Sequence, residues 1–216
     1  MANLFGRFGR VSFSLGVLTA IFASTSTPAF AASPALSLVG LSNWSSPSDS
    51  PDLGGTSKAA YGGGAYLDLP LVRRVSLQIG ALYVPHKTDF VSASQTVTAN
   101  SVQVPALLNF HFNRFLTFGF GGYYARYIGQ FRETNDSTGI QSNSNYSDVG
   151  LMDSDYGVVG SVAMHVPVAH TVDFTVDGRY NYGLKNLVSD PSLTPGGLSS
   201  EKTRDIQVLA GFTFHI

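Results

Sequence analysis

Residues 205–216 read DIQVLAGFTFHI, and apolar side chains occupy every second position of this stretch. In an extended strand, side chains two residues apart lie on the same face. One face would carry Ile206, Val208, Ala210, Phe212, Phe214 and Ile216. The opposite face would carry mostly polar residues and glycine. A strand with one apolar face needs cover, which lipid supplies when the strand closes a barrel in a bilayer.

The amino-terminal residues show the order of zones that is typical of a secretory signal. Arginines precede an apolar run over 11–23, which is shorter than the ~20 residues of a membrane-spanning helix. Ala29 and Ala31 then offer the small side chains that signal peptidase accepts. We therefore expect residues 1–31 to be a signal peptide, cut after Ala31 or one residue later. Residues 32–216 would form one barrel domain.

The composition excludes several classes of protein. The chain has no cysteine, so a lipidated amino terminus, disulfides and thiol chemistry are excluded. Thirteen basic and fourteen acidic residues nearly balance, and no basic patch indicates a nucleic-acid partner. Aromatic and β-branched residues favour strands over helices. No segment after the signal is long and apolar enough for a transmembrane helix, so any membrane residence requires a barrel.

Eight segments of the chain alternate as strands do. They lie at about 35–43, 59–69, 74–85, 100–113, 115–127, 154–166, 172–183 and 205–216. The connections are alternately short, near 70–73, 113–114 and 167–171, and long, near 44–58, 86–99, 128–153 and 184–203. Outer-membrane barrels have tight periplasmic turns and long extracellular loops. The pattern therefore predicts an all-β fold, an eight-stranded antiparallel up-and-down transmembrane β-barrel.

Aromatic residues form two groups on the apolar face. Tyrosines lie near the long connections, at Tyr61, Tyr83, Tyr124, Tyr156, Tyr180 and Tyr182. Phenylalanines lie near the short turns, at Phe112, Phe118, Phe174 and Phe214. Two aromatic girdles are typical of a barrel in a bilayer. The alternative is a soluble lipocalin-like barrel with its apolar face inside, because sequence alone does not say which face is outside.

Three segments resemble motifs of a known family. The segment DYGVVG at 155–160 looks like an Asp-x-Gly-x-x-Gly run of the outer membrane protein beta-barrel domain family, in its PorT-like group. The segment DGRYNYGL at 177–184 is similar to that family's Asp-x-Arg-Tyr-x-x-Gly-Leu segment, and VPALL at 104–108 resembles its Pro-Leu-Leu strand. The resemblance implies an eight-stranded barrel in the outer membrane of a Gram-negative cell envelope, without a shared catalytic residue. Ile216, where phenylalanine is usual, and Ala106 depart from the pattern.

Charged residues on the polar face suggest an ion pair inside the barrel. Asp177 and Arg179 are two residues apart, so their side chains share a face and can meet. Such a pair is charge-assisted and would fix the packing of a narrow lumen. We expect Gly157 to leave room for the guanidinium, with Asp155 or Asp205 as further luminal partners. A substrate site is the alternative interpretation of these four charged residues.

One segment resembles a hydrolytic centre. His86 and Asp89 lie in a predicted long loop, with Ser92 and Ser94 nearby. A hydrolase needs a base within hydrogen-bond reach of its nucleophile, which proximity in sequence does not show. The His-x-Ser-Asn pattern of lipid-A deacylases is also absent at His86. We therefore expect no catalytic residue here.

Histidines near the short turns are the remaining candidate ligands. They are His111, His165, His170 and His215. They lie on different segments and would hold a metal only if the strand register aligned them. We expect no metal and no cofactor.

These observations favour a non-enzymatic barrel with a structural or surface-interaction role. Eight strands enclose only enough space for side chains, so an open pore is not expected. A narrow channel for ions or small solutes is the first alternative, and a hydrolase acting at the rim is the second. The expected partners are outer-membrane lipid and, during biogenesis, periplasmic chaperones and the barrel-assembly machinery. The sequence identifies no extracellular partner.

Overall fold

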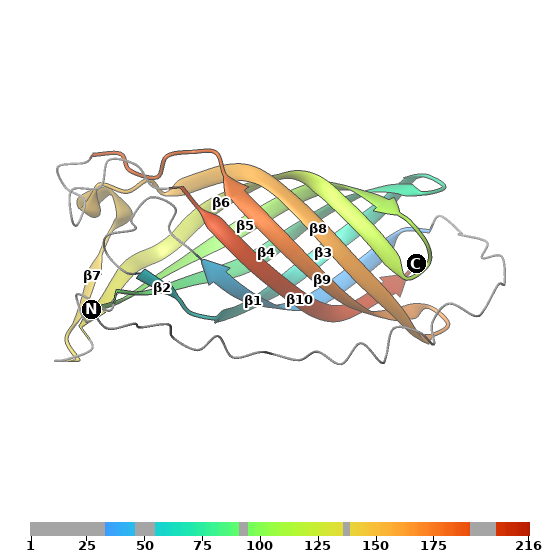
Figure 1. Cartoon of the computed structure of the whole chain (residues 1–216), viewed down its shortest axis with the longest axis horizontal. Coiled ribbons are helices and arrows are strands. Elements are labelled where there is room, and N and C mark those ends of the chain that lie inside the picture. The colour runs from blue at the N-terminus through green and yellow to red at the C-terminus, as the bar shows by residue number, and fades with distance from the viewer. Residues whose placement is uncertain (1–32, 46–54, 91–94, 136–138, 191–201) are drawn as a thin grey trace, which may run out of the picture.

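The computed structural model describes residues 33–45, 55–90, 95–135, 139–190 and 202–216. The expected signal peptide, residues 1–31, lies outside these ranges. Eight long strands form the body of the protein (Figure 1). They are β1 (Ala35–Ser45), β3 (Ala60–Val72), β4 (Val75–Phe90), β5 (Gln95–His111), β6 (Leu116–Asn135), β8 (Ser154–Ala169), β9 (Val172–Gly183) and β10 (Arg204–His215).

The eight strands close into a barrel in which every neighbouring pair is antiparallel. The first and last strands pair along their whole length, from Ala35 opposite His215 to Ser45 opposite Asp205. The pairing of β4 with β5 completes the ring. Each of the eight strands pairs with the one that follows it in sequence, and the last strand pairs with the first. The predicted up-and-down topology is therefore confirmed.

Three smaller elements lie at the end of the barrel that carries the long connections (Figure 1). Strand β2 (Gly55–Ser57) pairs with β4, and β7 (Gln141–Ser144) pairs with β6. The 3₁₀ helix η4 (Tyr146–Val149) follows β7. Within the described residues, no helix is long and apolar enough to cross a membrane.

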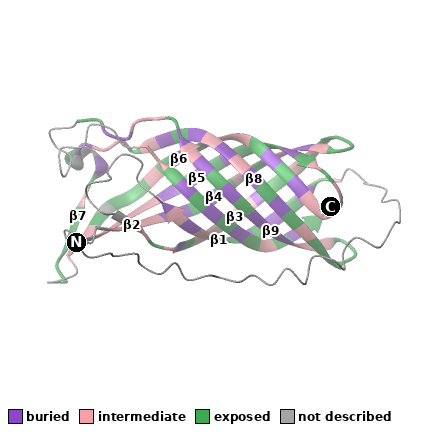
Figure 2. Cartoon of the chain, viewed as in Figure 1, coloured by how far each residue is buried: buried purple, intermediate pink, exposed green. Residues whose placement is uncertain are grey.

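Buried and exposed residues alternate along the strands of the barrel (Figure 2). The exposed outer wall is apolar, and the buried inner wall is mixed and largely polar. Along β1 and β10, buried and exposed residues alternate with the period of a strand. Tyr61 is 77% exposed and Phe112 is 69% exposed, whereas Asn181 and Gln207 on the inner wall are fully buried. A lipocalin-like barrel would have the reverse arrangement, so the structure rejects that alternative. Both aromatic groups face outward, as the sequence predicted.

Three strands extend further than the alternation predicted, all at the long-loop end. Strands β4 and β5 remain paired up to Phe90 and Gln95, so the connection expected over 86–99 is mostly strand. Strand β6 continues to Asn135 and pairs with β7 over residues that were expected to form a loop. These extensions are rich in Thr, Asn, Ser and Gln on both faces. Because lipid covers neither face there, no apolar alternation reveals them.

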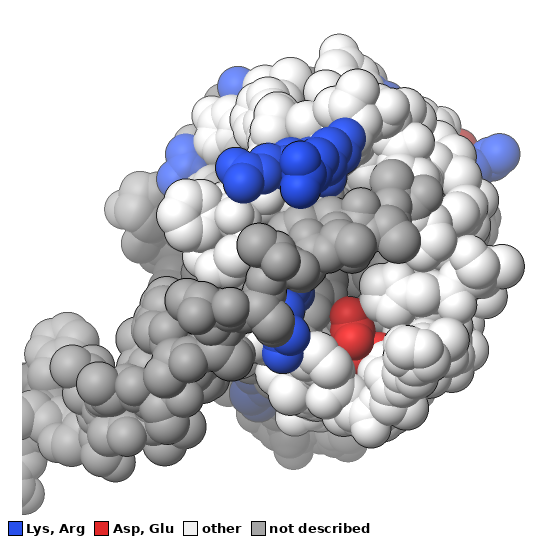
Figure 3. All heavy atoms as spheres, turned by 90° about the vertical axis from the view of Figure 1, so that its right-hand side faces the viewer, with Lys and Arg blue, Asp and Glu red and all other residues white. Residues whose placement is uncertain are grey.

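The short-turn end of the barrel carries exposed arginines. Figure 3 views this end and shows Lys and Arg side chains gathered along part of the rim, with an acidic side chain inside the opening. Arg73 and Arg74 lie in the turn between β3 and β4, and Arg114 lies in the turn between β5 and β6. The amide of His111 donates to the carbonyl of Arg74, so these two turns are neighbours.

Candidate functional site

The predicted ion pair lies inside the barrel on β9. Asp177 and Arg179 are both buried, and the Nη2 and Nε atoms of Arg179 lie 2.7 and 2.8 Å from Oδ2 of Asp177. The guanidinium also lies over the ring of Tyr66, 4.6 Å from its centroid. Two nitrogens of the guanidinium thus share one carboxylate oxygen in a charge-assisted contact, which fixes the arginine inside the lumen. The predicted Asp177–Arg179 pair is therefore confirmed as a contact.

Two hydrogen bonds join opposite walls of the barrel. Arg179 on β9 donates from Nη2 to Oε1 of Gln78 on β4, over 2.7 Å. Gln207 on β10 donates from Nε2 to Oε1 of Gln103 on β5, over 3.1 Å. In the order of the eight strands, each of these two pairs is separated by half the ring. Side chains therefore span the lumen at its middle, which fits the space that eight strands enclose.

The other two predicted luminal acids have different partners. Asp155 accepts a hydrogen bond of 2.9 Å from the hydroxyl of Tyr123, and Oδ2 of Asp205 lies 3.6 Å from Nδ1 of His86. Both carboxylates face the lumen, as expected, but neither contacts Arg179. The structure thus divides the four charged residues into one ion pair and two separate acids.

Gly157 does not make room for Arg179 as the sequence suggested. In the register of β8 and β9, Arg179 lies opposite Ser161, and Gly157 lies opposite Gly183. A Cβ atom at Gly157 would lie 2.7 Å from the ring of Tyr123 and closer still to the carbonyl of Tyr182. Gly157 therefore allows Tyr123 to lie flat against the inner wall. The prediction was wrong because the register of the two strands was unknown.

His86 lies in the lumen, on β4, and not in a loop. Its Nδ1 atom is 2.8 Å from Oγ of Ser45, and its Nε2 atom is 3.1 Å from Oγ of Ser101. Asn43 donates to Ser45, and Ser101 donates to the carbonyl of Val84. These contacts form a continuous chain of hydrogen bonds from β1 to β4 and β5.

His86 and Asp89, the two described residues of the possible hydrolytic centre, do not contact each other. Asp89 forms an ion pair with Lys58 and accepts a hydrogen bond of 2.9 Å from Thr96, away from His86. Ser92 and Ser94 lie outside the described residues. Burial raises the pKa of Asp89, but the hydrogen bonds from Lys58 and Thr96 outweigh it and lower the pKa below its ordinary value. Asp89 therefore anchors the junction of β2 and β4.

The short-turn half of the lumen holds connected hydroxyl and imidazole groups. Ser37, Thr213, Thr175 and His165 form a chain with successive distances of 2.8, 2.8 and 3.1 Å. His111 bonds in the same way to hydroxyls on both of its neighbouring strands. These polar atoms are paired within the wall, which is the usual state of buried polar groups.

The four histidines that the sequence grouped together do not form a metal site. His111 and His165 bond to luminal hydroxyls, while His215 forms an ion pair of 2.9 Å with Asp173. His170 lies in the turn between β8 and β9. In the part of the chain that the structure describes, no three His, Asp or Glu residues are arranged to hold a metal.

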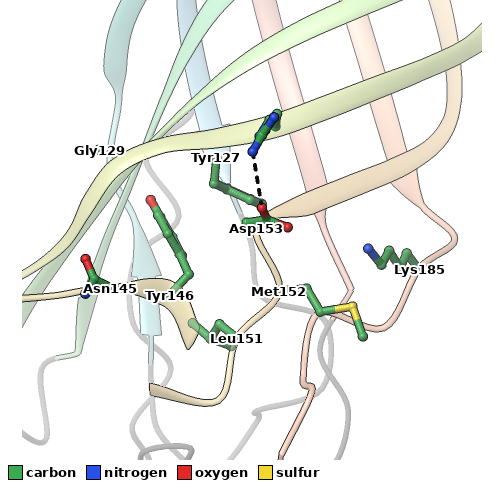
Figure 4. A pocket seen from close by; sticks show the side chains of 9 residues that line it. Tyr127, Gly129, Asn145, Tyr146, Leu151, Met152, Asp153 and Lys185 are labelled. Carbon is green, nitrogen blue, oxygen red and sulfur yellow. Dashed lines mark ion pairs between the residues drawn. The ribbon is translucent and has the colours of Figure 1, made fainter. Parts of the chain in front are cut away.

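A pocket of about 370 Å³ lies at the long-loop end (Figure 4). Strand β6, the segment from η4 to β8 and the residues after β9 supply its walls. Its lining residues are Arg126, Tyr127, Gly129, Asn145, Tyr146, Leu151, Met152, Asp153 and Lys185. Two cations and one carboxylate give the pocket a net positive charge. The 3.8 Å Arg126–Asp153 pair contributes little stability, because both side chains are more than 60% exposed.

Three aromatic rings in tilted contact connect the pocket to the lumen. Tyr127 lies between His86 and Tyr146, with centroid distances of 5.6 and 5.3 Å. Tyr127 comes from β6, and Tyr146 comes from η4. Burial raises the pKa of the Tyr146 phenol above its ordinary value, so this ring stays neutral at physiological pH. Sequence reasoning missed these ring contacts because nothing in the sequence places η4 over β6.

Comparisons with known proteins agree with this architecture. The profile of the family described as outer membrane protein beta-barrel domain matches residues 23–189. None of the curated proteins compared with the chain matches it.

Solved structures with this fold were also found. OprG, an outer membrane protein from Pseudomonas aeruginosa, is similar at 12% identity, with a TM-score of 0.51, over 86% of this chain and 96% of OprG. Neisserial surface protein A is 15% identical, with a TM-score of 0.47, over 85% of this chain and 97% of that one. Ail, the attachment invasion locus protein of Yersinia pestis, is 11% identical, with a TM-score of 0.46, over 85% of this chain and 99% of Ail.

Proposed function

The chain belongs to the outer membrane protein beta-barrel domain family and resides in the outer membrane, and from this premise we propose a non-enzymatic surface-interaction role. The barrel holds its long loops outside the cell, where they contact other molecules, and its lumen stays closed. The hydrogen bond from Arg179 to Gln78 carries the proposal, because it joins opposite walls at the middle of the lumen. A structural role in the envelope is the second candidate.

The pocket at the long-loop end supports a role in contact with the outside. It combines two tyrosine rings with the cations Arg126 and Lys185. Aromatic faces with a net positive charge suit a ligand that has an apolar face and an anionic group. In outer-membrane barrels the long loops face the exterior. A ligand would therefore reach this pocket without crossing the membrane.

The contacts of His86 argue against catalysis. Ser101 donates its hydroxyl proton to the carbonyl of Val84 over 3.2 Å, so this proton is not directed at the imidazole. Ser101 is also only 1% exposed. A serine nucleophile needs a base that accepts its proton and space for the substrate carbonyl. Neither condition fits Ser101, and we assign no catalytic residue.

Biogenesis completes the proposal. We propose that residues 1–31 are removed as a signal peptide, so that the mature chain begins at Ala32 or Ser33. Periplasmic chaperones and the barrel-assembly machinery would then deliver the barrel to the membrane. We also place the chain in the PorT-like group, on the DGRYNYGL segment at 177–184. Mass spectrometry of envelope protein tests the cleavage, and an intact Met1 terminus would contradict it.

Complementation of a deletion strain separates the surface role from the structural role. The strain would be tested for detergent sensitivity and for binding of its surface to a panel of anionic glycans. Wild type and a pocket variant, Lys185→Glu, would be expressed at equal levels. A surface role predicts that Lys185→Glu loses glycan binding while detergent resistance is retained. Equal glycan binding by both proteins, with detergent resistance restored by both, would support the structural role.

A further inference from the structure

Five oxygen atoms in the long-loop half of the lumen are buried without a hydrogen-bond partner in the described structure. They are Oδ1 of Asn43, Asp155, Asn181 and Asp205, and Oε1 of Gln207. Each of these residues is at most 3% exposed. Buried polar atoms are nearly always paired, so a group of five requires a physical explanation.

The strand register brings these residues onto one wall. Asn43 on β1 lies opposite Gln207 on β10, and Asp205 on β10 lies opposite Asn181 on β9. Gln207 and Asp205 are two residues apart and share the luminal face. Asp155 lies on β8, the next strand, close enough to Asp205 for the two charges to repel each other, and Thr203 and the amide of Tyr156 also interact with its carboxylate. Four consecutive strands, β1, β10, β9 and β8, therefore supply the five oxygens. We call these five residues the oxygen wall.

Charge in this half of the lumen is unbalanced. Arg179 lies opposite Gln207 in the register of β9 and β10, and its Nη1 atom is also unpaired, but its ion pair with Asp177 balances its charge. The facing wall contributes the neutral side chains Gln103 and Tyr123, and His86 at 3.6 Å from Asp205. Both ring nitrogens of His86 are already bonded to serine hydroxyls. Two carboxylates thus face the lumen without a matching fixed cation.

We propose that the oxygen wall binds one hard divalent cation of the calcium class. Calcium takes six to eight oxygen ligands from carboxylates, amide carbonyls and water, and it tolerates irregular geometry. Asp155 and Asp205 match its charge, and Asn43, Asn181 and Gln207 offer neutral amide oxygens. Only two of the five residues are carboxylates, which agrees with the lack of a three-residue His, Asp and Glu cluster among the described residues. Zinc would instead select imidazole or thiolate.

The cation would connect the stability of the barrel to the divalent ions of its surroundings. Asn43 and Gln207 lie at the seam between the first and last strands, and Asp205 and Asn181 lie at the next pairing. An ion held by these residues would bind the folded barrel and not the unfolded chain. It would therefore stabilise the closed ring by mass action. This inference does not depend on the proposed surface role.

The test uses refolded protein in detergent that contains no lipopolysaccharide, because that lipid binds calcium itself. Equilibrium dialysis with calcium chloride measures the bound ion, and thermal unfolding with calcium or with a chelator measures its effect. We expect one calcium ion per barrel and a higher melting temperature with calcium. Asp205→Asn should weaken binding at least about tenfold, since affinity follows the number of charged ligands. Asp68→Asn is the matched control, because Asp68 faces the short-turn half and bonds to Asn109.

Three outcomes would overturn the proposal. The first is that wild type binds no calcium in dialysis. The second is that Asp68→Asn loses calcium binding as fully as Asp205→Asn. The third is that magnesium and calcium raise the melting temperature equally, and only as much as the screening of charges by salt would. If Asp205→Asn does not fold, Asn181→Ser removes a neutral ligand, and it should weaken binding without changing the net charge. Unchanged affinity in Asn181→Ser would also contradict the oxygen wall as the site.

Discussion

The two halves of the lumen use polar side chains in different ways. In the short-turn half, Ser37, Thr213, Thr175 and His165 form a chain of hydrogen bonds within the wall. In the long-loop half, the carboxylates and amides of the oxygen wall leave five buried oxygens unpaired. A wall that satisfies its own polar atoms serves stability, whereas a wall of unpaired oxygens is arranged for something outside itself. Arg179 lies where the halves meet.

The largest loss of stability is expected from a substitution of Arg179, at the boundary between the two halves. Arg179→Ala removes the partner of Asp177 and the hydrogen bond to Gln78, and it leaves a buried carboxylate unpaired. We expect the free energy of unfolding to fall by roughly 3–5 kcal/mol. Urea unfolding in detergent or lipid measures the loss. Arg132→Ala on the exposed extension of β6 is the control, and equal losses in both variants would remove the central role of Arg179.

The next largest effect compares arginine substitutions on the outer wall and on the inner wall of the barrel. Val176 and Thr175 are neighbours on β9, but Thr175 is luminal and Val176 faces outward. Val176→Arg would place a charge in lipid and should destabilise the barrel by roughly 2–4 kcal/mol. Thr175→Arg would instead be decided by steric fit in the lumen. Tolerance of arginine at Val176, and likewise at Ile79 and Phe118, would mean that the assigned faces are reversed.

A smaller effect compares the two halves directly. Thr213→Val breaks the chain between Ser37 and Thr175, so it should cost about 1 kcal/mol of unfolding free energy or slightly more. Asp205→Asn, measured with a chelator, removes a buried charge that has no close cationic partner and should cost less. The two variants would be unfolded side by side. A greater loss of unfolding free energy in Asp205→Asn would mean that the polar groups of the long-loop half already stabilise one another without a bound ion.

The smallest effect lies outside the barrel body, at the contact between β2 and β4. The folded-state pKa of Asp89 is below its ordinary value, so its stabilisation is present above that ordinary value and is lost as pH falls through the folded-state pKa. Hydrogen exchange at Gly55–Ser57 should therefore become faster under acidic conditions, relative to the intrinsic rate. Lys58→Ala should reduce this pH dependence, and the hydrogen bond from Thr96 should preserve part of it. An unchanged pH dependence in Lys58→Ala would assign it to another group.

Local patterns predicted more of this molecule than long-range contacts did. Alternation identified the eight strands and the residues that share a face, because lipid on one side imposes an apolar face over the membrane. The contact between Asp177 and Arg179 followed from their spacing on one strand. The bond from Arg179 to Gln78 did not, because it depends on ring closure across half the chain. His86 was assigned to a loop because the polar extension of β4 has no apolar alternation.

Conductance in planar bilayers tests the closed lumen most directly. Purified wild type and Arg179→Ala would be reconstituted at equal density and recorded at neutral pH in potassium chloride. The side chains that join opposite walls at Gln78–Arg179 and Gln103–Gln207 predict that wild type is silent. Arg179→Ala is expected to be less stable, and a current carried by this variant alone would arise from loss of the contact with Gln78. Large, steady conductance of wild type would contradict the closed lumen and favour a channel.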